Sequence, residues 1–122
     1  MSPTIVLKDG RPFLAIGSPG GATIITTVLQ ILVNRIDLGM SLPDAIAAPR
    51  ASQRNAANSD AEPAFLALPT TAGLKALGQN FATVGKIGTA AGLEFLPHGR
   101  ILAAGEPERL HGTSAMVIST HR

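Results

Sequence analysis

Apolar and polar residues alternate at the start of the chain and then give way to a longer, helical period. Residues 4–7 and 12–16 predict two strands, and the dipeptide Asp9-Gly10 between them is a strong signal for a tight hairpin. Apolar residues then recur every three or four positions across residues 22–38, which predicts a helix buried over much of its circumference. The first third of the chain is therefore expected to be a hairpin followed by a buried helix.

Helix signals continue through the middle of the chain, and strand signals return towards its end. Gly39 is the expected end of the long helix, and Ser41 with Asp44 three residues later predicts the cap of a short helix that stops before Pro49. The remaining expected elements are a polar loop (50–64), a small strand (65–68), a helix closed by Gly78 (70–77), a strand (81–84), a hairpin (90–96 and 101–104), a loop (105–112) and a last strand (114–119). Hairpins mixed with two or three helices predict an α+β arrangement of layers.

Two adjacent glycines, Gly20 and Gly21, stand where the second strand meets the long helix. Ordering two glycines costs more conformational entropy than ordering other residues, so we expect a structural or functional reason for the pair. A helix start offers N–H donors to an anion, but the spacing fits neither a dinucleotide-binding fingerprint nor a P-loop, and Ser18 does not occupy a nucleophile elbow. Three interpretations stay open at this point: a tight turn without a ligand, a phosphate site, and an oxyanion hole formed by the two N–H groups.

Composition narrows the function classes. The chain of 122 residues is 45% hydrophobic and 15% charged, so it can bury a core and is not a disordered tail. No cysteine is present, which excludes disulfides and thiolate chemistry. The formal net charge is only +2, so we expect no nucleic-acid partner. The arginines are scattered without interleaved aromatic residues: Arg50, Arg54, Arg100, Arg109 and Arg122.

Histidines and the acidic residues near the end of the chain give no recognisable catalytic or metal-binding pattern. His98, His111 and His121 are dispersed, and no serine or carboxylate stands at a triad spacing from them. We interpret them as solvated surface residues, and Glu106 and Glu108 as a solvated acidic turn. No metal site and no cofactor are therefore expected.

Several short stretches, taken in order, match one known family. They are MSPTIVL (1–7), DG (9–10), GSPGG (17–21), ITTVLQ (25–30), APR (48–50), GTA (88–90), PHG (97–99) and GEPER (105–109). Together they resemble the C-terminal part of the small subunit of γ-glutamyltransferase, also called glutathione hydrolase. The resemblance covers nearly the whole chain and is most specific in residues 1–50. Glu106 stands where many family members carry Asp, and residues 50–60 depart from the commonest pattern.

The resemblance implies an N-terminal-nucleophile hydrolase. Residues 1–122 would then be a single incomplete domain, an α+β part of a four-layer αββα sandwich. In the family a freed N-terminal Thr attacks the γ-glutamyl carbonyl with its own amine as base, and the γ-glutamyl group passes to water, an amino acid or a peptide. Gly20 and Gly21 match the two glycines whose N–H groups form the oxyanion hole, so we take them as the catalytic site residues.

The same resemblance places the nucleophilic Thr and the residues that bind the glutamyl amino and carboxylate groups outside these 122 residues. We therefore expect the isolated chain to be inactive. The expected partners are a γ-glutamyl small molecule resembling glutathione and the remainder of the parent enzyme. The resemblance also implies an exported protein, in the periplasm, outside the cell or at its surface.

Two other functions compete with this interpretation. One is a non-catalytic fragment that associates with itself through exposed apolar strands, because uncovered strand edges are adhesive. The other is a small phosphate-binding domain that uses the same glycine pair at the start of the helix.

Overall fold

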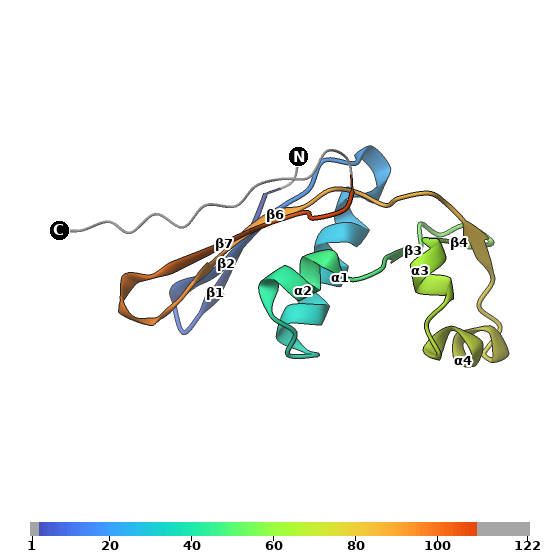
Figure 1. Ribbon diagram of the computed structural model, residues 1–122, viewed down its shortest axis with the longest axis horizontal. Helices are drawn as coiled ribbons and strands as arrows, with labels where there is room; N and C mark the ends of the chain where they lie inside the picture. Colours follow the sequence, from blue (N-terminus) through green and yellow to red (C-terminus); the bar gives the residue numbers. More distant parts are fainter. Residues whose placement is uncertain (1–2, 110–122) are drawn as a thin grey trace.

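The computed structural model describes residues 3–109 and arranges them in two lobes (Figure 1). The sheet lobe holds an antiparallel sheet in the order β1-β2-β6-β7, together with two helices. Its elements are β1 (Thr4–Lys8), β2 (Arg11–Gly17), a 3-10 turn η1 (Gly21–Thr23), α1 (Ile24–Ile36), α2 (Leu42–Ala47), β6 (Ala91–Phe95), a 3-10 turn η2 (Pro97–Gly99) and β7 (Ile101–Gly105). The small lobe holds β3 (Ala51–Ser52), β4 (Ser59–Ala61), α3 (Pro63–Leu66), α4 (Thr70–Ala76) and β5 (Phe81–Thr83).

The first hairpin forms as its turn sequence predicts. Asp9 and Gly10 have φ angles of 52° and 74°, the left-handed values that both central residues of a type I′ turn need. Val6 pairs with Leu14 but Leu7 pairs with Pro12, so one residue of β2 is bulged out of the ladder. The expected hairpin is confirmed.

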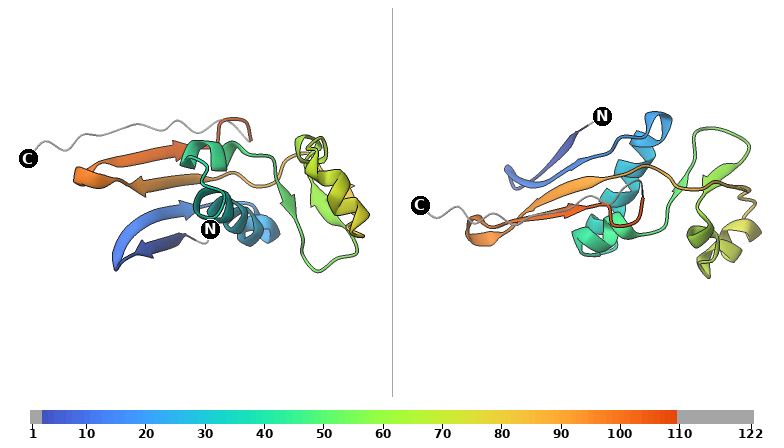
Figure 2. Two further views of the ribbon diagram at one scale, coloured as in Figure 1. Left: turned by 90° about the horizontal axis from the view of Figure 1, so that it is seen from below. Right: turned by 45° about the horizontal axis from the view of Figure 1, so that its top comes forward.

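Both helices of the sheet lobe lie on one face of the sheet (Figures 1 and 2). Their boundaries follow local signals: Gly39 has a φ of 69° just beyond α1, and Ser41 caps α2 by accepting a bond from the Asp44 N–H at 3.2 Å. Alternate residues of β2, β6 and β7 meet the two helices in one core. Its buried members are Leu14, Ile16, Val28, Ile31, Leu42, Ala45, Ile46, Ala90 and Ala104.

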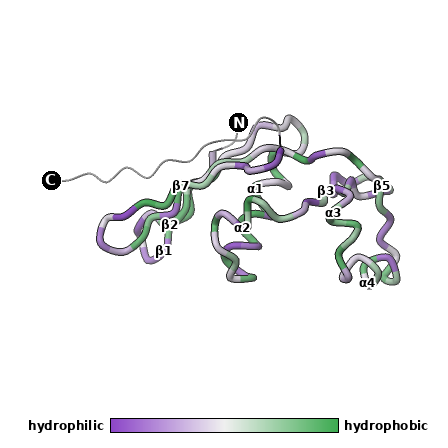
Figure 3. The backbone as a smooth tube through the Cα atoms, viewed as in Figure 1, coloured by the Kyte–Doolittle hydropathy of each residue, from purple (hydrophilic) through white to green (hydrophobic). Residues whose placement is uncertain are grey.

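The opposite face of the sheet is apolar as well. Ile5, Ala15, Leu93 and Ala103 lie directly across from one another on the four strands, and Ile5 is 67% exposed. Figure 3 shows hydrophobic residues along these strands and hydrophilic residues at the hairpin tips. Among residues 3–109, no element covers this face.

Helix α1 differs from its expected burial. Val28 and Ile31 face the core, but Ile25 is 75% exposed and Leu29 is 57% exposed, so the expectation that the helix is buried over much of its circumference is wrong within residues 3–109. A helix with apolar residues on two sides is predicted to be buried when only its sequence is considered. None of the helices in the described part of the chain is both long and apolar enough to cross a bilayer.

Two further expectations fail in the small lobe. The polar segment 50–64 contains β3 and β4, which have only two and three residues and are too short to show alternation. The expected strand 65–68 is instead the end of helix α3 and the turn after it, because Pro63 supplies the φ angle of a first helical turn and Phe65 packs on Phe81 with ring centroids 6.0 Å apart. The expected strand 114–119 lies outside the described residues. The helix closed by Gly78 and the strand that begins at Phe81 are confirmed.

Candidate functional site

Hydrogen bonds from Thr23, at the start of the helix, stabilise the turn between β2 and α1. We call residues 18–21 the glycine turn. The N–H and the hydroxyl of Thr23 both donate to the Gly20 carbonyl, at 3.1 and 2.9 Å. Ser18 is fully buried, and its hydroxyl donates to the Pro19 carbonyl at 2.7 Å. These bonds use the carbonyl groups of Pro19 and Gly20 and do not involve the N–H groups of Gly20 and Gly21.

Gly20 and Gly21 have φ angles of 145° and 58°, which L side chains rarely adopt. A Cβ at Gly20 would lie 2.9 Å from the Thr23 hydroxyl oxygen, whereas one at Gly21 would meet nothing within 4 Å. Both residues are exposed, and no hydrogen bond within residues 3–109 uses either N–H group. The structure thus leaves two successive donors unpaired at the start of the long helix, and their assignment as an oxyanion hole remains a prediction.

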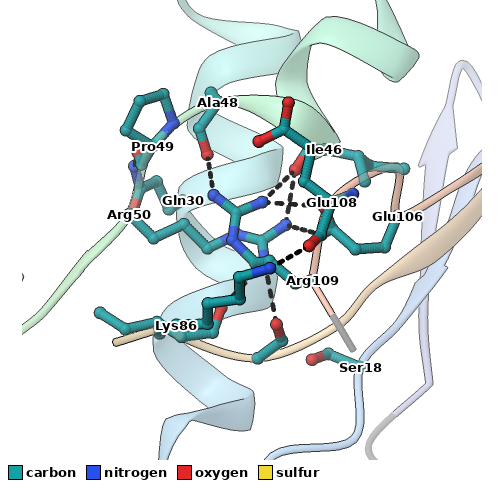
Figure 4. Close-up of polar contacts among 12 residues, drawn as sticks. Ser18, Gln30, Ile46, Ala48, Pro49, Arg50, Lys86, Glu106, Glu108 and Arg109 are labelled. Carbon is teal, nitrogen blue, oxygen red and sulfur yellow. Dashed lines mark hydrogen bonds and ion pairs between the residues drawn. The ribbon is translucent and has the colours of Figure 1, made fainter. Parts of the chain in front are cut away.

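A buried cluster of four charged residues lies at the junction of the two lobes. We call Arg50, Glu62, Glu106 and Arg109 the buried ion network. Arg109 donates from Nε and Nη2 to the two oxygens of Glu62, both at 2.7 Å, which is the bidentate geometry of a strong pair. Arg109 Nη1 and Arg50 Nη2 each donate to Glu106 at 2.9 Å (Figure 4). The four side chains therefore form one continuous chain of alternating charge.

The network also binds the backbone of distant segments. The Arg50 guanidinium donates to the carbonyls of Ile46 at 2.6 Å, Ile87 at 2.9 Å and Gly88 at 3.3 Å. The Glu62 carboxylate accepts the N–H groups of Arg50 and Ile87, at 2.9 and 2.8 Å. The end of α2, the start of β3, the end of β4 and the link from β5 to β6 are thereby joined to the segment that follows β7.

Charge pairing and burial oppose each other in this network. Burial raises the pKa of Glu62, but hydrogen bonds from Arg109 and from two backbone N–H groups outweigh it and hold that pKa below its ordinary value. Burial and the neighbouring Arg109 lower the pKa of Arg50, which a guanidinium tolerates while staying protonated. Burial likewise lowers the pKa of Arg109, yet Glu62 and Glu106 together raise it above its usual range. The pair of Glu62 and Arg109 is therefore charged at neutral pH.

The network corrects one expectation from the sequence. Glu106 is 0% exposed and not part of a solvated acidic turn, because Arg50 and Arg109, far apart in the chain, both pair with it. The contact is a tertiary one, because the segment after β7 folds back onto the end of α2. A local sequence pattern does not predict such a contact. Glu108 is exposed as expected, although its carbonyl accepts a bond from Lys86.

In the part of the chain that the structure describes, neither feature includes a histidine. His98 is exposed in the turn between β6 and β7, as expected; His111 and His121 lie outside the described residues. Within residues 3–109, no three His, Cys, Asp or Glu side chains gather where they would hold a metal ion.

Comparison with known proteins identifies a family. The Gamma-glutamyltranspeptidase family profile matches residues 1–117. The glutathione hydrolase proenzyme of Escherichia coli K12 is 37% identical over 115 residues, which is 94% of this chain and 20% of that protein. An acylase proenzyme of a Pseudomonas strain, ACY 1, is 48% identical over 50 residues, covering 41% of this chain and 9% of its own length.

Solved structures give the same answer for the fold. A mutant of Helicobacter pylori gamma-glutamyltranspeptidase superposes with a TM-score of 0.80 and 36% identity, covering 88% of this chain and 60% of that one. The α+β elements of this chain are thus part of the αββα sandwich of an N-terminal-nucleophile hydrolase, as expected. The chain spans about a fifth of the length of the Escherichia coli relative.

Proposed function

The chain belongs to the gamma-glutamyltranspeptidase family, and from this membership we propose that it supplies the oxyanion hole for transfer of a γ-glutamyl group. The substrate class is a γ-glutamyl small molecule resembling glutathione, and the acceptor is water, an amino acid or a peptide. The observation that carries the proposal is the pair of unpaired N–H groups at Gly20 and Gly21, exposed where β2 meets α1.

The two donors act when the tetrahedral intermediate forms. When the threonine hydroxyl oxygen bonds to the γ-glutamyl carbonyl carbon, the carbonyl π electrons move to its oxygen and leave a negative charge there. Two preorganised N–H donors stabilise that oxygen, and removal of one such donor typically lowers kcat by about 10²- to 10³-fold. The threonine's own amine takes the hydroxyl proton during the attack and passes it to the departing amine as the C–N bond breaks. Attack by water or an acceptor amine on the resulting ester then releases the γ-glutamyl group, and the proton that the attacking group loses returns through the same amine to the threonine oxygen.

The exposed apolar surfaces support a second part of the proposal, that the chain works together with the remainder of its parent enzyme. A second sheet of the αββα sandwich would cover the face that carries Ile5 and Leu93, because two sheets pack through their apolar faces about 10 Å apart. The exposed side of α1 with Ile25 and Leu29 would contact a neighbouring helix. The nucleophile and the residues that bind the glutamyl group would come from that remainder.

The test is a chimera in which this chain replaces the matching segment of the Escherichia coli relative. Turnover of γ-glutamyl-p-nitroanilide is measured for the chimera and for its Gly21→Pro and Gly21→Ala variants. Proline removes the N–H donor and also excludes the φ of 58° at this position, so it should lower kcat by at least about 10²- to 10³-fold. Alanine keeps the donor, and its Cβ enters open space, so it should lower kcat by less than about tenfold.

Two outcomes would overturn parts of the proposal. A Gly21→Pro chimera that keeps the kcat of the parent chimera would show that this donor does not serve the reaction. Turnover by the purified 122-residue chain alone would show that its own residues include a nucleophile.

A further inference from the structure

The backbone at Gly88 lies directly against the glycine turn. A Cβ built at Gly88 would lie 2.6 Å from the Thr27 hydroxyl oxygen and 3.2 Å from the Ser18 hydroxyl oxygen. A Cβ at Gly20 would in turn lie 3.4 Å from the Gly88 Cα atom. Gly88 therefore fills the space between α1 and the glycine turn, and only a residue without a side chain fits there.

The buried ion network holds Gly88 in that place. Arg50 donates to the carbonyls of Ile87 and Gly88, and Glu62 accepts the Ile87 N–H. Gly88 has a φ of 63°, so its own conformation also favours glycine. The segment is thus fixed from one side by hydrogen bonds and from the other by close packing.

Thr27, the side chain that a Cβ at Gly88 would meet, is itself buried. The Thr27 and Thr89 hydroxyl oxygens are buried, and neither has a hydrogen-bond partner among residues 3–109. Thr27 is held beside Gly88 by packing rather than by a hydrogen bond of its hydroxyl. A substitution at Thr27 therefore changes the contact without breaking a polar network.

We propose that Gly88, held by the buried guanidinium of Arg50, is a positioning residue that sets the orientation of the N–H groups of Gly20 and Gly21. Arg50 acts through Gly88 and does not touch the substrate. The ion network at the lobe junction thus controls the geometry of a catalytic turn on the far side of Gly88. This inference rests on the proposed oxyanion role for its catalytic meaning, but the coupling itself is testable without turnover.

The first experiment uses the amide resonances of the 122-residue chain. The Gly88→Ala variant is expected to shift the ¹H–¹⁵N cross-peaks of Gly20 and Gly21, while the cross-peak of Gly73 in α4 stays in place. Thr27→Ala removes both Thr27 atoms that the new methyl group meets. The double variant should therefore return both glycine cross-peaks towards their original positions.

The matched control is Gly39→Ala. Gly39 has a φ of 69°, close to that of Gly88, but a Cβ there meets nothing within 4 Å. It carries the same backbone strain at the other end of α1 without the contact. If Gly39→Ala shifts Gly20 and Gly21 as much as Gly88→Ala does, the effect is general strain and the proposal is wrong.

A gentler variant covers the case in which Gly88→Ala does not fold. Thr27→Val keeps the shape of the side chain, breaks no hydrogen bond, and places a methyl group where the hydroxyl oxygen meets Gly88. It should shift the cross-peaks of Gly20 and Gly21 in the same sense by a smaller amount. Where Gly88→Ala folds, unchanged cross-peaks in both variants would overturn the proposal; where it does not fold, unchanged cross-peaks in Thr27→Val alone would do so.

Kinetics of the chimera separate this inference from the proposed function. Gly88→Ala should lower kcat about 10- to 100-fold with KM within about threefold, because it misplaces the donors while the residues that bind the substrate stay the same. Thr27→Ala should restore most of that kcat.

The outcomes separate the two proposals. If Gly21→Pro abolishes turnover but Gly88→Ala leaves kcat intact, the positioning role fails while the oxyanion role stands. If Gly21→Pro has no effect, the oxyanion role fails and the resonance experiment decides the coupling alone.

Discussion

The polar groups of the glycine turn and of the buried ion network differ in exposure and in hydrogen-bond pairing. In the described part of the chain, Gly20 and Gly21 are exposed residues, and their N–H groups have no acceptor. In the network, every carboxylate oxygen of Glu62 and Glu106 accepts a guanidinium N–H. Exposed donors can exchange water for a substrate oxygen, whereas buried charges need permanent partners. The first arrangement therefore suits chemistry, and the second suits architecture.

The largest effect is expected from opening the network. Glu106→Ala leaves the guanidinium groups of Arg50 and Arg109 buried with a single carboxylate between them. Removing one partner of a buried pair typically destabilises a protein by about 3–5 kcal/mol. A urea titration followed by circular dichroism should show a loss of this size in the free energy of unfolding.

The control for this prediction is Glu108→Ala. Glu108 lies two residues away and is exposed, so its removal should change the free energy of unfolding by about 0.5 kcal/mol or less. Equal effects of the two substitutions would mean that the network contributes nothing beyond an ordinary surface charge.

Acid should open the same network reversibly. The folded-state pKa of Glu62 is lower than the ordinary value of a glutamate, because Arg109 and two backbone N–H groups favour its charged form despite burial. The stabilisation from Glu62 is therefore fully present above the unfolded-state pKa and is lost as the pH falls through the lower, folded-state pKa. Glu62→Gln should flatten the decline in the free energy of unfolding between neutral pH and that range. A decline of unchanged slope in the variant would assign the acid sensitivity to other carboxylates.

A smaller effect separates packing from backbone strain next to the glycine turn. Alanine at Gly39 or at Gly88 takes a left-handed conformation, which is unfavourable by about 1–2 kcal/mol. At Gly88 the methyl group also meets Thr27, and overpacking adds about 1–3 kcal/mol. Thermal unfolding of the two variants should therefore show Gly88→Ala as the less stable one. Equal stability would mean that Thr27 moves aside without penalty.

The two regions also differ in how far the sequence predicted them. Local signals were sufficient for the first hairpin, since Asp9-Gly10 dictates its turn, and for α2, since Ser41 and Asp44 cap it. The position of Gly20 and Gly21 at a strand-to-helix junction was also predicted from local pattern. Their chemical role came from the family resemblance and not from spacing.

The network was missed for a physical reason. Arg50 and Glu106 are 56 residues apart in the chain, and their pairing exists only once β7 lies beside β6 and its following segment reaches α2. The helix α3 was missed because a run of four residues gives no period, so Pro63 was a better guide than the apolar residues Phe65 and Leu66. Contacts made by folding back of distant segments leave no mark on a local pattern.

The smallest expected effect comes from an ion pair with nearly the same distance as one in the network. Arg54 and Asp60 lie 2.8 Å apart, against 2.9 Å for Arg50 and Glu106, but their side chains are 45% and 26% exposed. Exposed pairs typically contribute about 0–1 kcal/mol, because water and salt screen the charges. A double-mutant cycle with Arg54→Ala and Asp60→Ala should give a coupling free energy in that range that shrinks further as salt is added. A coupling as large as that expected for Glu106 would show that distance rather than burial determines the strength of these pairs, and the contrast between the exposed turn and the buried network would lose its physical basis.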